Sequence, residues 1–367
     1  MLPVNNTLSS GIRYTPTDTT VTPSAPMAET HVGSSSELNT KLLKELIAQT
    51  LIPGGEDKLE RSRAILNHYG QDTSAEDFNN SKIYTALGQL KTANDTAQPS
   101  DDVAEVIANQ KQQVKNTELA LADLKREVAT NRTKANYSAS QFVATKEKAL
   151  KEASADEGNK REELSTHTSY AELWARMAGA IKNIKGDYVD FYADLMQKYT
   201  EMYEAYNKHV QGAATNSIST GDDGNNVKFN ISTMDKGYKE FTSEINKIDL
   251  GSVKNWDKMT PEERKSMITT LEPAFKVNNS GKIEFNLDQY SAAPNYPSGI
   301  SEGKVSTASY QAWLASFNAG GSALQSNMQS FAQRYSQANS TFDNLNKVLS
   351  GAISSLAECA KDVFKAI

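Results

Sequence analysis

The sequence predicts a mainly α-helical, elongated protein: a long antiparallel intramolecular coiled coil, an N-terminal helical hairpin or bundle domain, and a small mixed α/β insert domain. Two long stretches carry apolar residues at alternating steps of three and four, which is the spacing of a coiled-coil seam. The stretch between them shows strand and turn signals instead. Only 38% of the 367 residues are hydrophobic, and this low content favours an elongated helical protein over a compact enzyme.

Composition argues against several classes of function. The net charge is -6 with acidic and basic residues interspersed, so the chain lacks the basic footprint of a nucleic-acid-binding protein. The sequence has no apolar run of about 18 residues, so we predict no membrane-spanning segment. Met1–Thr7 has neither a basic nor an apolar region, and we expect no cleaved secretory signal. Cys359 is the only cysteine, so we expect no intramolecular disulfide and a small buried apolar role for this residue.

The N-terminal part of the chain divides into a tail and a helical domain. Residues 1–36 are rich in Thr, Ser, Pro and Asn without apolar periodicity, and we predict that they are disordered. Residues 37–160 are predicted to form a helical domain that ends in a long polar helix from Val103 to about Ser154. The apolar stripe of this helix is thin, so we expect it to lie against another part of the protein. Three shorter helices precede it, in Leu38–Leu51, Leu59–Leu66 and Ser81–Lys91.

Residues 165–212 and 306–367 are predicted to be the two helices of the coiled coil. They carry the only strong, sustained seams in the sequence, and a long helix with so narrow an apolar face needs a partner. The predicted seam positions are Trp174, Met177, Ile181, Ile184, Tyr188, Phe191, Leu195 and Met202 in the first helix, and Leu324, Met328, Phe331, Tyr335, Phe342, Leu345, Leu349 and Leu356 in the second.

The second helix contains an irregularity in its spacing. Gly320, Leu324 and Met328 follow two consecutive steps of four. Such a stutter locally unwinds a coiled coil, and Gly320–Gly321 makes distortion there easy. We therefore predict a kink, a π-bulge or a break at Asn318–Ser322, which would divide the helix into two pieces.

Residues 213–305 are predicted to form the mixed insert domain. Apolar residues alternate strictly over Val227–Ile231, which indicates a strand, and a helix is predicted over Met234–Ile248. Thr260–Glu263 is typical of a helix start, with Thr as N-cap, Pro at the first position and Glu closing a capping box. A turn before Ile283 then indicates a β-hairpin. We expect the insert to cap one end of the rod and to return the chain so that the two seams run antiparallel.

The sequence predicts no catalytic, cofactor-binding or metal-binding residues. The four histidines are scattered without metal-ligand spacing, and phosphate-binding glycine loops and nucleophile elbows are absent from the sequence. The acidic turn Asp222–Asn226 lacks the sixth-position glycine and the closing glutamate of a calcium loop. Tyrosines from Tyr188 to Tyr206 suit a stacking platform, but their helical spacing favours packing in the seam. We therefore expect the protein not to be an enzyme.

Several stretches carry a recognisable sequence. They are Tyr310–Trp313, Phe317, Tyr335–Ser350 and Ile353–Ser355 in the second helix, Glu172–Ala175 and Tyr199–Tyr203 in the first, and Asp223–Lys228 in the insert. Together they closely resemble the invasion plasmid antigen D family, the hydrophilic needle-tip proteins of type III secretion systems. The resemblance runs from Tyr170 to the C-terminus and is specific. Before His167 it is one of organisation only, and the long polar helix exceeds the family's usual N-terminal hairpin.

The resemblance implies a scaffold that caps the needle, restrains secretion until host contact and supports translocon assembly for host-cell invasion. The implied partners are the needle subunit, the hydrophobic translocator proteins and other copies of the chain in a ring of about five. Export would use an uncleaved signal within residues 1–36 and would carry the protein from the cytoplasm to the needle tip at the bacterial surface. The N-terminal hairpin would act as a built-in chaperone that masks the coiled coil.

The resemblance also implies two kinds of site. Bile salts such as deoxycholate bind some family members between hairpin and rod, and the corresponding cleft would lie near Trp174. For the needle subunit we expect contact with the exposed, amide-rich flank of the second helix, although solubility alone also explains such a flank. The residues of this predicted needle flank are Gln333, Gln337, Asn339, Asp343, Asn344 and Lys347.

Two other functions compete with this interpretation. A secreted helical-hairpin effector or toxin would need an apolar insertion segment, which the sequence lacks. A cytosolic coiled-coil secretion chaperone would not need the tail rich in Ser, Thr and Pro. Dependence of secretion on the residues before Ser36 would separate these alternatives from a needle-tip protein.

Overall fold

The computed structural model describes residues 41, 42, 45, 46, 48, 57–70, 78–95, 102–155, 175, 178, 179, 181–221 and 226–366. The predictions for residues 1–36, for Asp222–Asn225 and for Trp174 and Met177 fall outside these residues. For Leu356 and Cys359 only the backbone is described.

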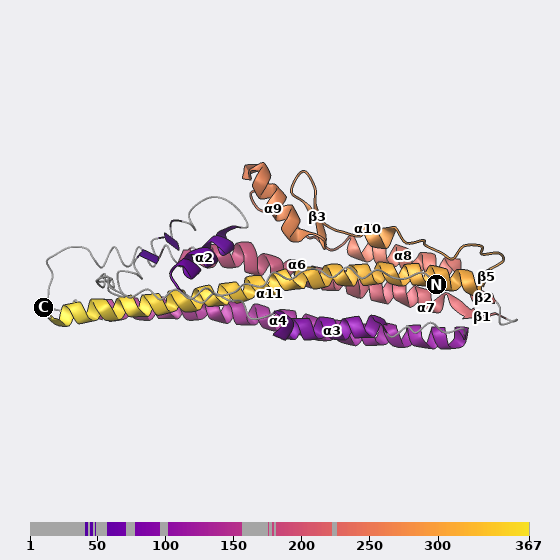
Figure 1. Ribbon diagram of the computed structural model, residues 1–367, viewed down its shortest axis with the longest axis horizontal. Helices are drawn as coiled ribbons and strands as arrows, with labels where there is room; N and C mark the ends of the chain where they lie inside the picture. Colours follow the sequence, from indigo (N-terminus) through magenta and orange to yellow (C-terminus); the bar gives the residue numbers. More distant parts are fainter. Residues whose placement is uncertain are drawn as a thin grey trace, which may run out of the picture.

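Long helices running side by side give the molecule the shape of a rod (Figure 1). α4 spans Val103–Ala155 and α11 spans Thr307–Ala366. The third long helix is described from residue 181 and continues through the π-helical segment η3 (Lys185–Val189), α6 (Asp190–Ala205), the π-helical segment η4 (Tyr206–Gln211) and α7 (Gly212–Asn216). The 60 residues of α11 correspond to about 90 Å at 1.5 Å per residue. The predicted elongated, mainly α fold is confirmed.

The helix containing α6 runs antiparallel to α11. The Tyr199 hydroxyl donates to the Leu324 carbonyl at 3.0 Å, and the Tyr192 ring packs edge-on against Phe331 at 5.9 Å. Residue numbers thus rise along one helix as they fall along the other, as the sequence predicts. The predicted seam side chains that the structure describes are buried, except for the half-buried Phe191: they are Ile181, Ile184, Tyr188, Leu195, Met202, Leu324, Met328, Phe331, Tyr335, Phe342, Leu345 and Leu349.

The rod contains a third helix that the sequence did not assign to it. α4 runs parallel to α11, since the Tyr335 hydroxyl donates to the Val128 carbonyl at 3.4 Å and the Ser138 hydroxyl donates to Asp343 at 2.7 Å. The side chains of its thin stripe are nevertheless buried, among them Ala135, Ala149 and Phe142. The pairing of α11 with a single partner helix was therefore incomplete.

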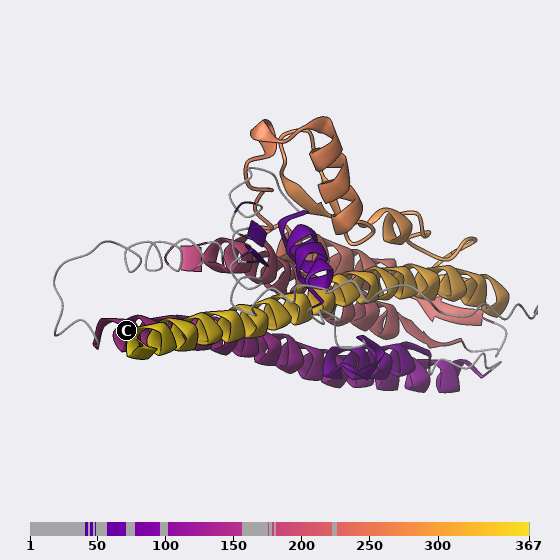
Figure 2. The same cartoon turned by 60° about the vertical axis from the view of Figure 1, so that its left-hand side comes forward.

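Smaller helices precede α4 in the chain. α2 spans Asp57–His68, η1 is a 3₁₀ turn at Phe78–Asn80, and α3 spans Lys82–Asp95. α3 and α4 lie side by side (Figures 1 and 2). Residues 41, 42, 45, 46 and 48 are helical, in agreement with the first predicted helix.

The predicted irregularity at Asn318–Ser322 was wrong, because α11 is a continuous α-helix through these residues. Gly321 does not distort the helix but leaves space for the Tyr206 side chain. A Cβ atom placed on Gly321 would lie 2.7 Å from the Tyr206 hydroxyl, so any larger residue would force the buried Tyr206 side chain to shift. Tyr206 begins the π-helical segment η4, and a π turn holds one residue more than an α turn. The departure from α-helical geometry at this level of the rod therefore lies in the partner helix and not in α11.

The insert begins with a small antiparallel sheet. β1 (Ile218–Thr220), β2 (Asn226–Phe229) and β5 (Lys304–Ser306) pair in the order β1-β2-β5. The strand predicted over Val227–Ile231 ends earlier, because the Asn230 side chain accepts a hydrogen bond from the Thr233 N–H and caps a helix. That helix, α8, spans Ile231–Ile245, three residues ahead of its predicted start.

The rest of the insert follows the predicted order. After the 3₁₀ turn η5 (Trp256–Lys258), α9 spans Pro261–Leu271, and the capping box between Thr260 and Glu263 is present. β3 (Phe275–Val277) and β4 (Ile283–Phe285) form the predicted hairpin, and α10 (Asp288–Ser291) leads back toward the rod.

The insert does more than cap the rod. The three-stranded sheet lies at one end, whereas α8 and α10 lie along the side and α9 with its hairpin stands out from the rod (Figures 1 and 2). Two aromatic clusters attach these parts. In one, the Phe275 ring lies 4.9 Å from Phe331; in the other, Tyr206 lies 5.5 Å from Tyr290 and 6.4 Å from Phe317.

Candidate interaction sites

α4 covers part of the predicted needle flank. Asp343 accepts a hydrogen bond from the Ser138 hydroxyl of α4 at 2.7 Å and pairs with Lys347 at 2.6 Å. Behind it, the Asn346 amide donates to the same hydroxyl at 3.3 Å. Of the six predicted residues, Gln333, Gln337 and Lys347 are exposed, and Asn339, Asp343 and Asn344 are half-buried. The expectation of a fully exposed flank therefore fails for the second group, and for Asp343 the cause is its contact with α4.

A second polar contact joins the α3–α4 hairpin to the rod. The Asn94 amide donates to the Tyr203 hydroxyl at 2.8 Å and to Gln325 at 2.6 Å. Its side-chain oxygen accepts from Thr117 at 3.1 Å, and its backbone carbonyl accepts from Gln113 at 2.9 Å. One asparagine thus joins four helices. Sequence reasoning missed it, because polar residues at heptad spacing look the same whether they face solvent or another helix.

The buried tyrosines serve as neutral packing groups. Burial raises the pKa of Tyr199 and Tyr203 far above the usual tyrosine range, and it has the same effect on the pKa of Tyr206. Their hydroxyls stay protonated, and Tyr199 donates to a backbone carbonyl of α11. This arrangement favours packing over the alternative of a ligand-stacking platform.

Two cavities lie beside Arg132. The first, about 450 Å³, lies between α4 and α6 and is lined by Lys125, Val128, Ala193 and Thr200 among others. The second, about 540 Å³, lies between the start of the α6 helix and the insert. Its apolar wall consists of Tyr188, Phe191, Val253, Met259 and Met267, and its cations are Arg132, Lys254 and Lys258.

The second cavity is also lined by four carboxylates, and the three aspartates among them, Asp187, Asp190 and Asp194, pair with lysines. Asp187 pairs with Lys254 at 3.0 Å across the two elements, and Asp190 pairs with Lys185 at 2.6 Å. In the part of the chain that the structure describes, no group of three or more His, Cys, Asp or Glu residues is arranged to hold a metal ion. None of the described helices is long and apolar enough to span a bilayer.

A sequence model for the family described as type III secretion systems tip complex components matches residues 15–257 and 297–364. The chain belongs to this family. The match extends over most of the N-terminal domain, where the sequence alone showed only a similar organisation. The predicted resemblance to the invasion plasmid antigen D family is confirmed.

Curated relatives of this tip complex component are invasion proteins. Invasin IpaD of Shigella flexneri is 30% identical over 200 residues, covering 53% of this chain and 60% of IpaD. Cell invasion protein SipD of Salmonella typhi is 28% identical over 215 residues, covering 53% of this chain and 62% of SipD. Translocator protein BipD of Burkholderia thailandensis is 30% identical over 177 residues, covering 47% of this chain and 52% of BipD. The chain thus spans about 60% of the length of the first of these relatives.

A solved structure of BipD from Burkholderia pseudomallei resembles this tip complex component with a TM-score of 0.47 and 20% identity, covering 78% of this chain and all of BipD. A second solved structure of BipD gives the same score and identity over 77% of this chain.

Proposed function

We propose that this tip complex component is a non-enzymatic scaffold that caps the type III secretion needle, restrains secretion until host contact and supports translocon assembly. Its partners would be the needle subunit, the hydrophobic translocator proteins and further copies of itself in a ring of about five. It would be secreted without a cleaved signal peptide and held at the needle tip on the bacterial surface. Family membership supports the setting, and the rod geometry supports a scaffold role.

The observation that carries the proposal is the way α4 covers the needle flank. The hydrogen bonds there are polar contacts of one serine: the Ser138 hydroxyl donates to Asp343 and accepts from Asn346, while the nearest large apolar side chain of α4, Phe142, is buried one turn further along. Polar groups that lose a protein partner regain hydrogen bonds from water, so such a contact separates at a lower free-energy cost than an apolar one. The flank is therefore suited to exchange α4 for the needle subunit.

Needle assembly tests this proposal. The double substitution Asp343→Ala with Lys347→Ala should lower occupancy of the needle tip and raise unregulated secretion. A matched control removes a similar surface pair in the insert, Lys276 and Asp288, which lie 2.5 Å apart. Ser138→Ala removes the hydrogen bond from α4 to Asp343 but leaves the flank residues in place, so this variant should assemble normally. If the folded double variant assembles and restrains secretion like the parent, this flank does not contact the needle.

We further propose that an amphipathic anion such as deoxycholate binds beside Arg132, rather than only near Trp174. Both cavities have volumes in the range of small-molecule sites and combine apolar walls with cations. A steroid carboxylate would pair with Arg132 while its ring system lies on the apolar side chains.

Titration with deoxycholate below its micellar concentration tests this site. Arg132→Gln should weaken saturable binding about tenfold through loss of one charge-assisted contact. The control is Lys134→Gln, an exposed residue two positions further along α4. Equal affinity in parent and Arg132→Gln would place any binding elsewhere, and it would leave the needle-tip proposal unaffected.

A further inference from the structure

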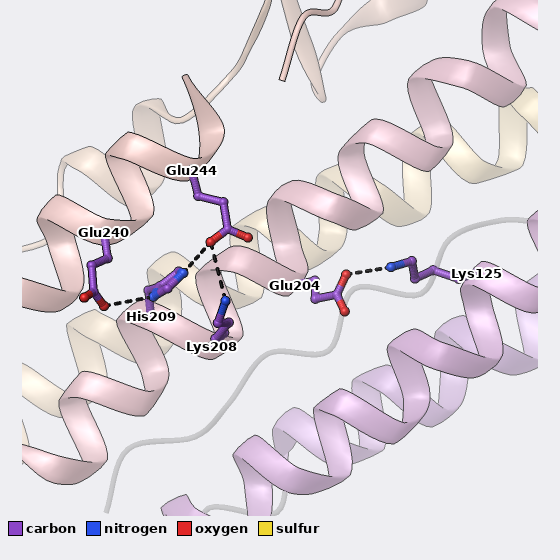
Figure 3. Close-up of polar contacts among 6 residues, drawn as sticks. All are labelled: Lys125, Glu204, Lys208, His209, Glu240 and Glu244. Carbon is purple, nitrogen blue, oxygen red and sulfur yellow. Dashed lines mark hydrogen bonds and ion pairs between the residues drawn. The ribbon is translucent and has the colours of Figure 1, made fainter. Parts of the chain in front are cut away.

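His209 lies between two glutamates of α8 (Figure 3). Its Nδ1 atom is 3.1 Å from a carboxylate oxygen of Glu240, and its Nε2 atom is 2.5 Å from one of Glu244. The two glutamates are one turn apart on α8, so the imidazole lies between them. The His209 side chain is only 12% exposed, whereas both glutamates are close to half exposed.

The backbone that carries His209 is unusual. It belongs to the π-helical segment η4, and in the described structure the buried Oδ1 atom of Asn207, next to Lys208 in this segment, has no hydrogen-bond partner. α8 approaches the segment closely, because a Cβ atom on Gly237 would lie 2.5 Å from the His209 carbonyl oxygen. The contact between α8 and η4 is thus tight, and the His209 ring lies within hydrogen-bond distance of two α8 carboxylates across it.

We infer that His209 is a proton-controlled clamp that holds α8 against the π-helical segment of the rod. A neutral imidazole has one N–H, so it can donate to only one glutamate and must turn a lone pair toward the other. An imidazolium has two N–H groups and donates to both. Loss of the proton therefore removes one charge-assisted hydrogen bond and places a lone pair against a carboxylate oxygen.

The other charged groups around the clamp do not replace the imidazolium. Lys208, on the same segment, lies 3.7 Å from Glu244, and Lys236 of α8 lies 3.8 Å from Glu240. Both lysines are largely exposed, so their contacts are screened by water. From α6, Glu204 is held by Lys125 of α4 at 2.7 Å (Figure 3). α7 carries no titratable residue.

The pH dependence has a definite sign. The hydrogen bond from His209 is the main cause that lowers the pKa of Glu244, so this carboxylate stays ionised to more acidic pH than a free glutamate. The clamp is closed where the glutamates are ionised and His209 is protonated. Only the imidazolium donates to both glutamates, so the clamp is weaker with a neutral ring, and in acid it is lost when the glutamates are neutralised. This inference does not depend on the proposed role at the needle.

Hydrogen–deuterium exchange of the full-length protein, corrected for intrinsic exchange rates, tests the clamp between about pH 5.5 and 8.5. We expect protection of the α8 amides to fall about fivefold as pH rises, the effect of one partly exposed charge-assisted hydrogen bond. His209→Gln, which cannot titrate, should abolish this pH dependence. His68→Gln, which changes a histidine of α2, should leave it intact.

Two further measurements keep the test independent of how His209→Gln folds. Nitrogen-15 NMR of the native His209 ring should show two N–H groups at the acidic end of the range. Glu240→Gln, which retains the histidine but removes one carboxylate, should reduce the pH dependence. The inference is overturned by pH-independent protection of α8 in the native protein, by the same dependence in His209→Gln, or by a ring with a single N–H at the acidic end.

Discussion

Replacing Gly321 by alanine tests how closely the helices of the rod approach each other. On an exposed helix face, Gly→Ala stabilises by up to about 1 kcal/mol because alanine has the higher helix propensity. At Gly321 the new methyl group would lie 2.7 Å from Tyr206 Oη and 3.3 Å from the nearest ring carbon. The Tyr206 ring is fully buried, so it cannot swing into solvent to make room.

The two effects oppose each other, and their magnitudes decide the sign. Overpacking in a dense core costs about 1–3 kcal/mol, which exceeds the propensity gain of about 1 kcal/mol. We therefore expect Gly321→Ala to destabilise the protein by about 1–2 kcal/mol. Gly351, in the same helix, has no atom within 4 Å of its added Cβ, and its alanine variant should be stabilised by about 0.5–1 kcal/mol.

Guanidinium denaturation followed by circular dichroism measures both variants, and a second substitution identifies the clash. The Tyr206 hydroxyl oxygen is the atom nearest to the added Cβ, so Tyr206→Phe removes the clashing atom and keeps the buried ring. In the Tyr206→Phe background, Gly321→Ala should lose most of its effect. If Gly321→Ala stabilises the parent as much as Gly351→Ala does, the close approach of Tyr206 to α11 is refuted.

Three other perturbations give further tests. Asn94→Ala should destabilise the protein by about 2 kcal/mol and speed proteolysis of the α3–α4 hairpin, because it leaves polar partners on three helices unpaired. An unchanged denaturation curve would contradict this. Phe331→Ala should cost about 3–5 kcal/mol in the free energy of unfolding, since its ring contacts both the rod and the β3–β4 hairpin, and a loss below about 1 kcal/mol would show a loosely packed site. Glu244→Gln should make the free energy of unfolding depend less on pH in acid. The pKa of Glu244 is lowered in the folded protein, so the ionised carboxylate stabilises the fold above its unfolded pKa, and this stabilisation is lost as pH falls through the folded pKa. Stability measured by denaturation from about pH 3 to 7 gives that curve, and an unchanged acid limb would exclude the contribution.

Local signals in the sequence were sufficient for much of the fold. The capping box at Thr260 and Glu263 is formed by residues three apart, so nothing distant can change it. The pairing of α6 with α11 followed from two apolar seams, because each needs a partner and only two are strong, and the antiparallel direction followed from the insert that returns the chain. The early end of β2 at Phe229 was missed because the cap at Asn230 began a helix within a pattern that still alternated.

The features of the candidate sites were harder to predict, because they depend on contacts between distant segments. Asn94 and Ser138 are polar residues on polar helices, and only the packing of α4 on α11 shows that they are bonded across an interface. Gly321 was correctly selected as unusual but given the wrong role: glycine permits both backbone distortion and close contact, and only the position of the Tyr206 ring distinguishes these uses.

The junction between the sheet and the rod has a mechanical consequence. β5 ends at Ser306 and α11 begins at Thr307, so no loop separates the last strand of the sheet from the longest helix. A continuous α-helix resists stretching, since every turn is held by backbone hydrogen bonds along its axis. A pull or a rotation applied to the middle of α11, where the predicted needle flank lies, would therefore be transmitted directly to the sheet at the end of the molecule.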